Sequence, residues 1–152
     1  MVKTLQRAAW LLLVISSAVS AQSIRVGDLE IHNAWARVSA PGAPSAGFML
    51  LVNHGTEDET LLSVSGEFAK KLEVHRSLEV DGVMKMQHQR EGVVIPAGGE
   101  VLFQPGSYHL MFMGLAKNFE LGEVYPVILN FEQAGAVPLN LEVRKAALHA
   151  DH

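Results

Sequence analysis

Three side chains with soft or borderline donor atoms occupy every second position of one short apolar stretch. Between Tyr108 and Gly114 these donors are His109, Met111 and Met113. The stretch is typical of a buried β-strand, and side chains alternate across a strand, so the imidazole and both thioethers are expected on one face. Thioether together with imidazole is a donor set that suits Cu(I).

An earlier stretch repeats this pattern. Met84, Met86 and His88 alternate, and His75 precedes them. The Asp-Gly pair at positions 81 and 82 is a strong hairpin signal, so it predicts that His75 and the two methionines lie close together. The chain contains no cysteine, so a soft metal would have to use methionine and histidine.

The first 21 residues have the features of a secretory signal peptide. Lys3 and Arg7 precede an apolar run from Ala8 to Val19, and a small-residue cleavage site ends at Ala21. The run is shorter than the ~20 apolar residues that a membrane span needs, and no cysteine follows it to carry a lipid anchor. We therefore expect an exported chain that begins near Gln22.

The net charge limits the possible partners of the protein, and its length limits the number of domains. Removing two of the 12 basic residues with the signal peptide leaves 10 against 16 acidic residues, so nucleic acid and anionic lipid are poor partners. The remaining 131 residues fit one domain, expected over residues 22–145, with residues 146–152 as a flexible tail that contains histidine.

Residues 22–145 read as a succession of short strands. Segments rich in Val, Ile, Leu and Phe recur about every ten residues between Gly- and Pro-containing turns, which is typical of an antiparallel sandwich or barrel. The expected strands are Ile24 to His32, Ala34 to Ser39, Gly47 to Asn53, Thr60 to Ser65, Lys71 to Leu78, Val83 to Gln87, Glu100 to Gln104, Tyr108 to Gly114, Val124 to Glu132 and Leu139 to Arg144.

The sequence lacks the motifs of several enzyme classes. It has no nucleophile elbow, no Gly-rich phosphate loop and no pair of histidines four apart on a helix. A blue-copper electron carrier needs a cysteine thiolate. We therefore predict a protein that is not an enzyme, in one of three classes: a metal chaperone, a copper storage or resistance binder, or a metal-free sandwich that binds a protein partner.

Several segments together form a more specific pattern. They are Asp-Gly-Val-Met-Lys-Met at 81–86, Ile-Pro-Ala-Gly-Gly at 95–99 and Pro-Gly-Ser-Tyr-His-Leu-Met-Phe-Met-Gly-Leu at 105–115, preceded by Ala-Trp-Ala-Arg at 34–37 with Pro41, Gly42 and Gly47. This pattern resembles the periplasmic copper chaperones of the PCu(A)C family. The resemblance covers essentially the whole chain after residue 21.

The resemblance implies a ligand set, because the family motif is His, ten residues, Met, about twenty-one residues and then His-x-Met. The implied copper ligands are His75, Met86, His109 and Met111. Here 22 residues separate Met86 from His109, and Arg76 occupies a position that is sometimes Met in the family.

The resemblance also implies a fold and a function. The fold is all-β, a single-domain cupredoxin-like antiparallel β-sandwich of the Greek-key type. The protein would hold one Cu(I) and deliver it to the copper centre of cytochrome c oxidase, so its partners would be the copper ion and an oxidase copper subunit or another periplasmic copper-assembly protein.

The other candidate donors have different expected roles. Met84 and Met113 are expected to pack beside the site or to act as reserve donors. The remaining histidines before the tail, His32, His54 and His88, are expected on the surface.

Two further regions carry an expectation. Trp35 is expected to fill the core, because a large aromatic side chain suits a sandwich strand. The tail offers His149, Asp151 and His152, whose nitrogen and oxygen donors suit Cu(II). A short solvated end is the equally weighted alternative for the tail.

Overall fold

The computed structural model describes residues 22–145, which form eleven β-strands and no helix. Among these residues, no helix is long and apolar enough to cross a membrane. The strands are β1 (Ser23–Val26), β2 (Leu29–Arg37), β3 (Ser45–Asn53), β4 (Glu59–Ser65), β5 (Ala69–Val80), β6 (Val83–His88), β7 (Val93–Ile95), β8 (Glu100–Phe103), β9 (Tyr108–Leu115), β10 (Val124–Phe131) and β11 (Gly135–Arg144).

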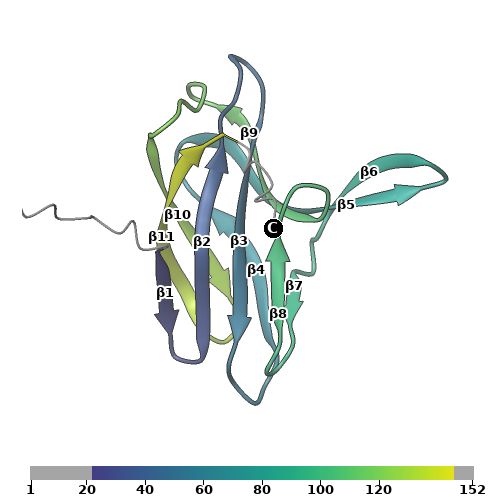
Figure 1. The fold of residues 1–152 in the computed structure, drawn as a ribbon, viewed down its shortest axis with the longest axis vertical. Helices are drawn as coiled ribbons and strands as arrows, with labels where there is room; N and C mark the ends of the chain where they lie inside the picture. Colours follow the sequence, from purple (N-terminus) through teal and green to yellow (C-terminus); the bar gives the residue numbers. More distant parts are fainter. Residues whose placement is uncertain (1–21, 146–152) are drawn as a thin grey trace, which may run out of the picture.

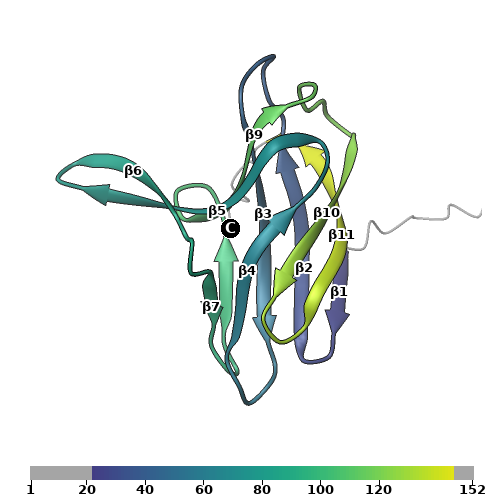
Figure 2. The same cartoon turned by 180° about the vertical axis from the view of Figure 1, so that it is seen from behind.

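The strands form one open sheet that folds over into two layers. Hydrogen-bonded neighbours follow the order β6-β5-β9-β8-β3-β2-β11-β10-β4-β7, with β1 on β2 and a further pairing of β9 with β3. Figures 1 and 2 show β2 and β3 in one layer and β4, β10 and β11 in the other. The predicted all-β sandwich is confirmed. Two pairings are parallel. β11 pairs with β2 over three residues of each strand, and β8 pairs with β9 only at Phe103 and Tyr108.

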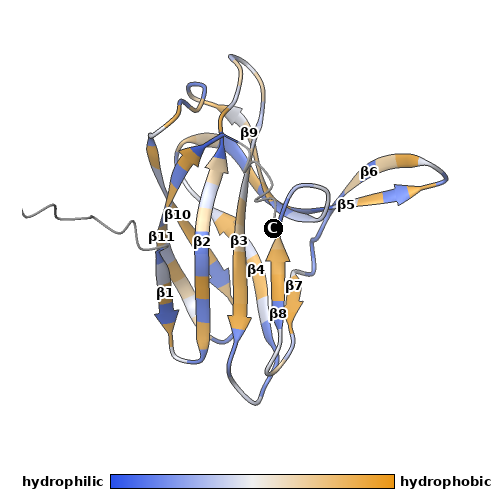
Figure 3. Cartoon of the chain, in the orientation of Figure 1, coloured by the Kyte–Doolittle hydropathy of each residue, from blue (hydrophilic) through white to orange (hydrophobic). Residues whose placement is uncertain are grey.

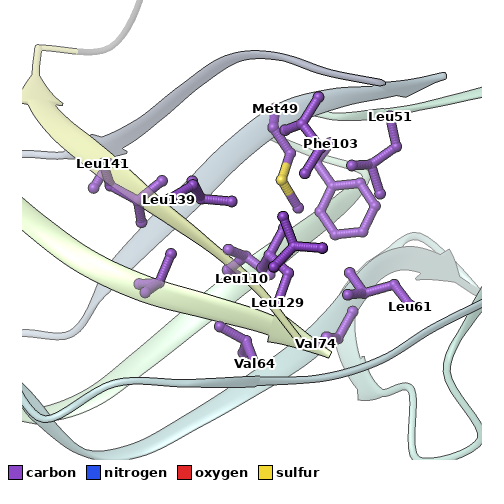
Figure 4. Close-up of a cluster of buried hydrophobic side chains, with 14 of the residues drawn as sticks. Met49, Leu51, Leu61, Val64, Val74, Phe103, Leu110, Leu129, Leu139 and Leu141 are labelled. Carbon is purple, nitrogen blue, oxygen red and sulfur yellow. The ribbon is translucent and has the colours of Figure 1, made fainter. Parts of the chain in front are cut away.

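Apolar side chains fill the space between the two layers. Figure 4 shows Met49 and Leu51 of β3 facing Leu129 of β10 and Leu141 of β11. Along β11 every second residue from Val137 onward is buried, as expected for a strand with one face against a core. Burial of this alternating set therefore explains why the segment is a strand.

The first strands differ from their expected bounds. The segment expected as one strand from Ile24 to His32 is divided by a turn at Gly27, whose φ is 58°, into β1 and β2. Conversely, β2 continues through Asn33, where a break is expected, by means of a bulge between His32 and Trp35. Asn33 has a φ of 51°, which asparagine tolerates better than most residues, so the strand bends there and does not end. The three-residue β7 is too short for its pattern to predict it.

The turn between β5 and β6 is the predicted hairpin. Asp81 and Gly82 have φ values of 52° and 76°, and a type I′ turn requires positive φ at both positions. The end of β5 and all of β6 project from the sandwich, and we call residues 77–88 the arm (Figures 1 and 2). Among the described strands, β6 pairs with β5 alone, so it is an edge strand.

Phe112 anchors β9 from its core side. It is fully buried, and its ring centroid lies 5.0 Å from that of Phe68 and 6.1 Å from that of Phe119. Replacing Phe112 by Ala should lower the free energy of unfolding by about 4 kcal/mol, because the cavity cannot close fully. Urea unfolding followed by fluorescence measures the change.

Leu121→Ala is the control for that measurement, since Leu121 is 62% exposed and its truncation should cost less than about 0.5 kcal/mol. Equal costs for the two variants would contradict the assignment of Phe112 to the core.

Candidate metal site

The register between β5 and β9 brings two predicted ligands side by side. His75 pairs directly with His109, and their ring centroids are 5.8 Å apart. Directly paired residues project from the same face of a sheet. Met111 follows His109 by two residues and therefore lies on that face as well. We call this surface the metal face.

Met86 reaches the same place from the arm. It pairs with Ser77, which lies two residues beyond His75 on β5. Met86, His109 and Met111 line one cavity of about 130 Å³, and Ser77 also contributes to its wall. The serine side chain is small, so it leaves room opposite Met86. Three of the four predicted ligands thus line the cavity, and His75 adjoins them beside His109.

Each of these two histidines has one ring nitrogen that is already hydrogen bonded. His75 Nε2 lies 2.6 Å from Glu73 Oε2, and His109 Nδ1 lies 3.1 Å from the carbonyl oxygen of Ser107. The other two nitrogens, His75 Nδ1 and His109 Nε2, are the only buried side-chain nitrogen or oxygen atoms among residues 22–145 that have no hydrogen-bond partner. An unpaired buried polar group costs about 1–3 kcal/mol, so two of them on adjacent side chains indicate a place for a ligand.

Glu73 orients the imidazole of His75. Its carboxylate receives a hydrogen bond from Lys71 Nζ at 2.7 Å and another from His75. These two bonds, in that order, lower the pKa of Glu73 to about 2. The ionised carboxylate can only accept, so the ring proton of His75 lies on Nε2 and the lone pair is at Nδ1. The alternation of Glu73 with His75 in the sequence is the one signal that could have identified this residue.

The imidazole of His109 adopts the opposite tautomer to that of His75. It is 4% exposed, and burial is the main cause that lowers its pKa. The nearby charges of His75 and Arg37 lower it further, whereas the hydrogen bond to the Ser107 carbonyl raises it. The ring is therefore neutral at pH 7. Because a carbonyl only accepts, the proton lies on Nδ1 and the lone pair is at Nε2.

One wall of the cavity is apolar. Ala46, which pairs with Met111, and Phe48 line it and form a small cluster with Trp35, whose ring centroid lies 4.8 Å from that of Phe48. Trp35 is buried as expected, but in this separate cluster and not in the core between the layers. The bulge in β2 accounts for this, because it changes which residues of the strand face the core.

The remaining histidines and methionines are placed as follows. His32 and His54 are partly exposed and both contact Glu30, at 3.1 Å and 2.7 Å, so their surface role is confirmed. Met113 is half-buried on the metal face. Met84 is 59% exposed on the arm, so it does not pack in the core, and its expected role as a reserve donor stays a prediction.

His88 is exposed, as expected, yet it lies close to the predicted ligands. Its ring centroid is 5.5 Å from that of His75, and its Nδ1 is 3.6 Å from Glu73 Oε2. The hairpin register, which pairs the two histidines directly, produces this proximity. The predicted signal peptide (residues 1–21) and the predicted Cu(II) donors of the tail lie outside the described residues.

Solved structures that are similar to this chain include PCuAC domains. The apo PCuAC domain from PmoF1 is 21% identical, with a TM-score of 0.69 over 82% of this chain and 99% of that domain. The copper-bound PCuAC domain from PmoF2 is also 21% identical, with a TM-score of 0.67 over 82% and 98%. The Cu(I) form of DR1885 from Deinococcus radiodurans is 23% identical, with a TM-score of 0.56 over 86% and 85%. The fold is therefore the cupredoxin-like sandwich of PCuAC domains, as the resemblance implies.

The chain belongs to the LpqE-like family, described as "Putative lipoprotein LpqE-like", whose model matches residues 29–143. It is 28% identical over 116 residues to "Putative lipoprotein Lxx21020" of Leifsonia xyli subsp. xyli (strain CTCB07), across 76% of this chain and 69% of that relative. Such names describe exported proteins associated with the cell envelope.

The two tautomers can be measured directly. Long-range ¹H–¹⁵N correlation spectra of the metal-free protein at pH 7 should show His75 protonated on Nε2 and His109 protonated on Nδ1, because Glu73 and the Ser107 carbonyl accept from those atoms. A histidine model peptide in the same buffer serves as the reference for a solvated imidazole. The reverse tautomer at either site would contradict the proposed orientation of its lone pair.

Proposed function

We propose that this protein is a periplasmic copper chaperone that binds one Cu(I) through His75, Met86, His109 and Met111. The observation that carries the proposal is the pair of unpartnered buried nitrogens, His75 Nδ1 and His109 Nε2, beside two methionines of one small cavity. A bound ion would supply the interaction that both nitrogens lack.

The donor chemistry favours Cu(I) over a harder ion. Two neutral thioethers and two neutral imidazoles leave the complex with the single charge of the ion, and soft sulfur ligands select Cu(I). The apolar wall formed by Ala46 and Phe48 limits water at the site. The copper-bound state of PmoF2 and the Cu(I) form of DR1885, which share the fold, support the same choice of metal.

Exposure favours delivery over permanent storage. His109 is 4% exposed, whereas Met86 is 62% exposed at the edge of the sheet. A partner's thiolates could therefore approach the ion from the side of Met86 and take it by ligand exchange. Methionine cannot be lost to disulfide formation in an oxidising compartment, although it can form a sulfoxide. The proposed acceptor is the copper centre of cytochrome c oxidase.

The tail is a separate proposal. Its donors His149, Asp151 and His152 suit Cu(II), and they lie outside the described residues. Binding of Cu(II) there would add to the Cu(I) site and does not depend on it.

Substitution of the two methionines tests the ligand set. Met86→Leu and Met111→Leu nearly conserve volume and polarity, so the fold should remain intact. Cu(I) affinity is measured anaerobically by competition with a chromophoric chelator. It should fall roughly 100-fold in each variant, because the loss of a residue that only supports a metal ligand already lowers metal affinity by up to about 100-fold.

Met49→Leu is the matched control, because Met49 is a core residue 2% exposed and is not among the residues that line the cavity. Its affinity should equal that of the native protein. Native affinity in both Met86→Leu and Met111→Leu would remove the proposed site.

Delivery requires its own test. Cu(I)-loaded protein mixed anaerobically with the metal-free soluble copper domain of cytochrome c oxidase should lose its copper to that domain, because thiolates outcompete thioethers for Cu(I). Separation of the two proteins and metal analysis by mass spectrometry measure the transfer. Copper that stays on this chain while binding remains tight would favour the storage or resistance alternative.

A further inference from the structure

The exposed edge strand of the arm carries two further donors, Met84 and His88, on either side of the proposed ligand Met86. Met84, Met86 and His88 alternate along β6, and their register partners on β5 are Glu79, Ser77 and His75. All of these residues therefore lie on the metal face. The donors run from the tip of the arm at Met84 to its base at His88.

Exposure decreases along this face from the methionines of the arm toward His75 and His109. Met84 and Met86 are 59% and 62% exposed. The side chain of His88 is 35% exposed and that of His75 is 13% exposed, while His109 is almost completely buried. The donors thus form a graded series from solvent to the buried nitrogens.

Packing does not account for the methionine at position 84. Its side chain lies on an edge strand, opposite the carboxylate of Glu79 and not against the core. Val80 and Val83 beside it are also exposed, at 39% and 57%, and Figure 3 shows hydrophobic residues on the projecting β6. The arm therefore presents thioethers where a solvated face would normally carry polar residues.

We infer that Met84 and His88 are transfer ligands, which bind Cu(I) transiently as it moves between solvent and the site of His75, Met86, His109 and Met111. This inference rests on the proposed function. Alternate residues of a strand are about 6.8 Å apart, a separation that flexible methionine side chains can bridge.

Each step of the movement is a ligand exchange. One bond from copper to sulfur or nitrogen forms as another breaks, the ion remains Cu(I), and no proton or electron is required. A neutral thioether suits this role because it holds the ion without the strong charge attraction of a thiolate. Met84 and His88 therefore change the rate at which Cu(I) is exchanged more than they change the equilibrium affinity of the protein for Cu(I).

The test separates rate from affinity. Cu(I)-loaded protein is mixed anaerobically with excess bicinchoninate, and stopped-flow absorbance follows release of the ion. Met84→Leu and His88→Gln should each slow release roughly fivefold, since a transient ligand lowers the barrier for exchange. Their equilibrium affinities, from competition with the same chelator, should stay within about twofold of the native value.

Two controls match the variants closely. Met113→Leu alters a methionine on the metal face that lies beyond Met111 and away from the arm. His32→Gln alters a histidine with the same 35% side-chain exposure as His88 and a neighbouring glutamate. Both should release copper at the native rate.

A spectroscopic readout gives an independent answer. With ¹³C-methyl methionine labelling, less than one equivalent of Cu(I) should broaden the Met84 signal by exchange and leave the Met49 signal sharp. Native release rates in Met84→Leu and His88→Gln, together with a sharp Met84 signal, would overturn the inference while leaving the four-ligand site intact. Failure of the native protein to bind Cu(I) would overturn both proposals.

Discussion

The antiparallel pairing of β5 with β9 is the constraint on which the candidate site depends. It sets His75 directly opposite His109, and the same register aligns Glu73 with Met111. A shift by one residue would move every one of these side chains to the other face of the sheet. Phe112 and Val74, which are buried on the opposite face of the two strands, penalise such a shift because it would expose them. The core therefore holds the metal face in register.

Polar groups around His75 and His109 orient their imidazole rings, and this orientation lowers the stability of the metal-free protein. Glu73 and the Ser107 carbonyl each fix one ring nitrogen, so the other nitrogen of each ring is left buried and unpaired. Such atoms cost stability, and a structure evolves to keep them where a ligand compensates. The low pKa of Glu73 keeps its carboxylate ionised well below neutral pH, so the acceptor for His75 Nε2 persists there.

In the proposed site, the sandwich would hold the metal ion and the arm would exchange it. The imidazoles are attached to strands in the body of the sheet, where their positions are rigid. Met86 belongs to an edge strand that pairs with β5 alone among the described strands. Edge strands are usually protected by charge, and β6 does carry Lys85, but two of the three β6 residues on the metal face are exposed methionines. An accessible soft donor beside a rigid pair of nitrogens is the arrangement that a carrier requires, because it must both bind the ion and give it up.

Much of the architecture follows from local sequence patterns. Alternation of apolar residues identifies most strands, and Asp81-Gly82 specifies the hairpin because that turn needs positive φ at both positions. The donor types and their spacing also follow from the sequence. The division of the first strand at Gly27 and the continuation of β2 through Asn33 do not, because one residue in the left-handed region can end a strand or only bend it.

What the sequence by itself determined was which residues can bind a soft metal and that they lie on strands. Only the tertiary structure decided that His75 faces His109, that Glu73 orients one of them, and that Met84 is exposed. The physical reason is that contacts between β5, β6 and β9 depend on register and on the twist of the whole sheet. Those are set by packing of the core, which no local pattern encodes.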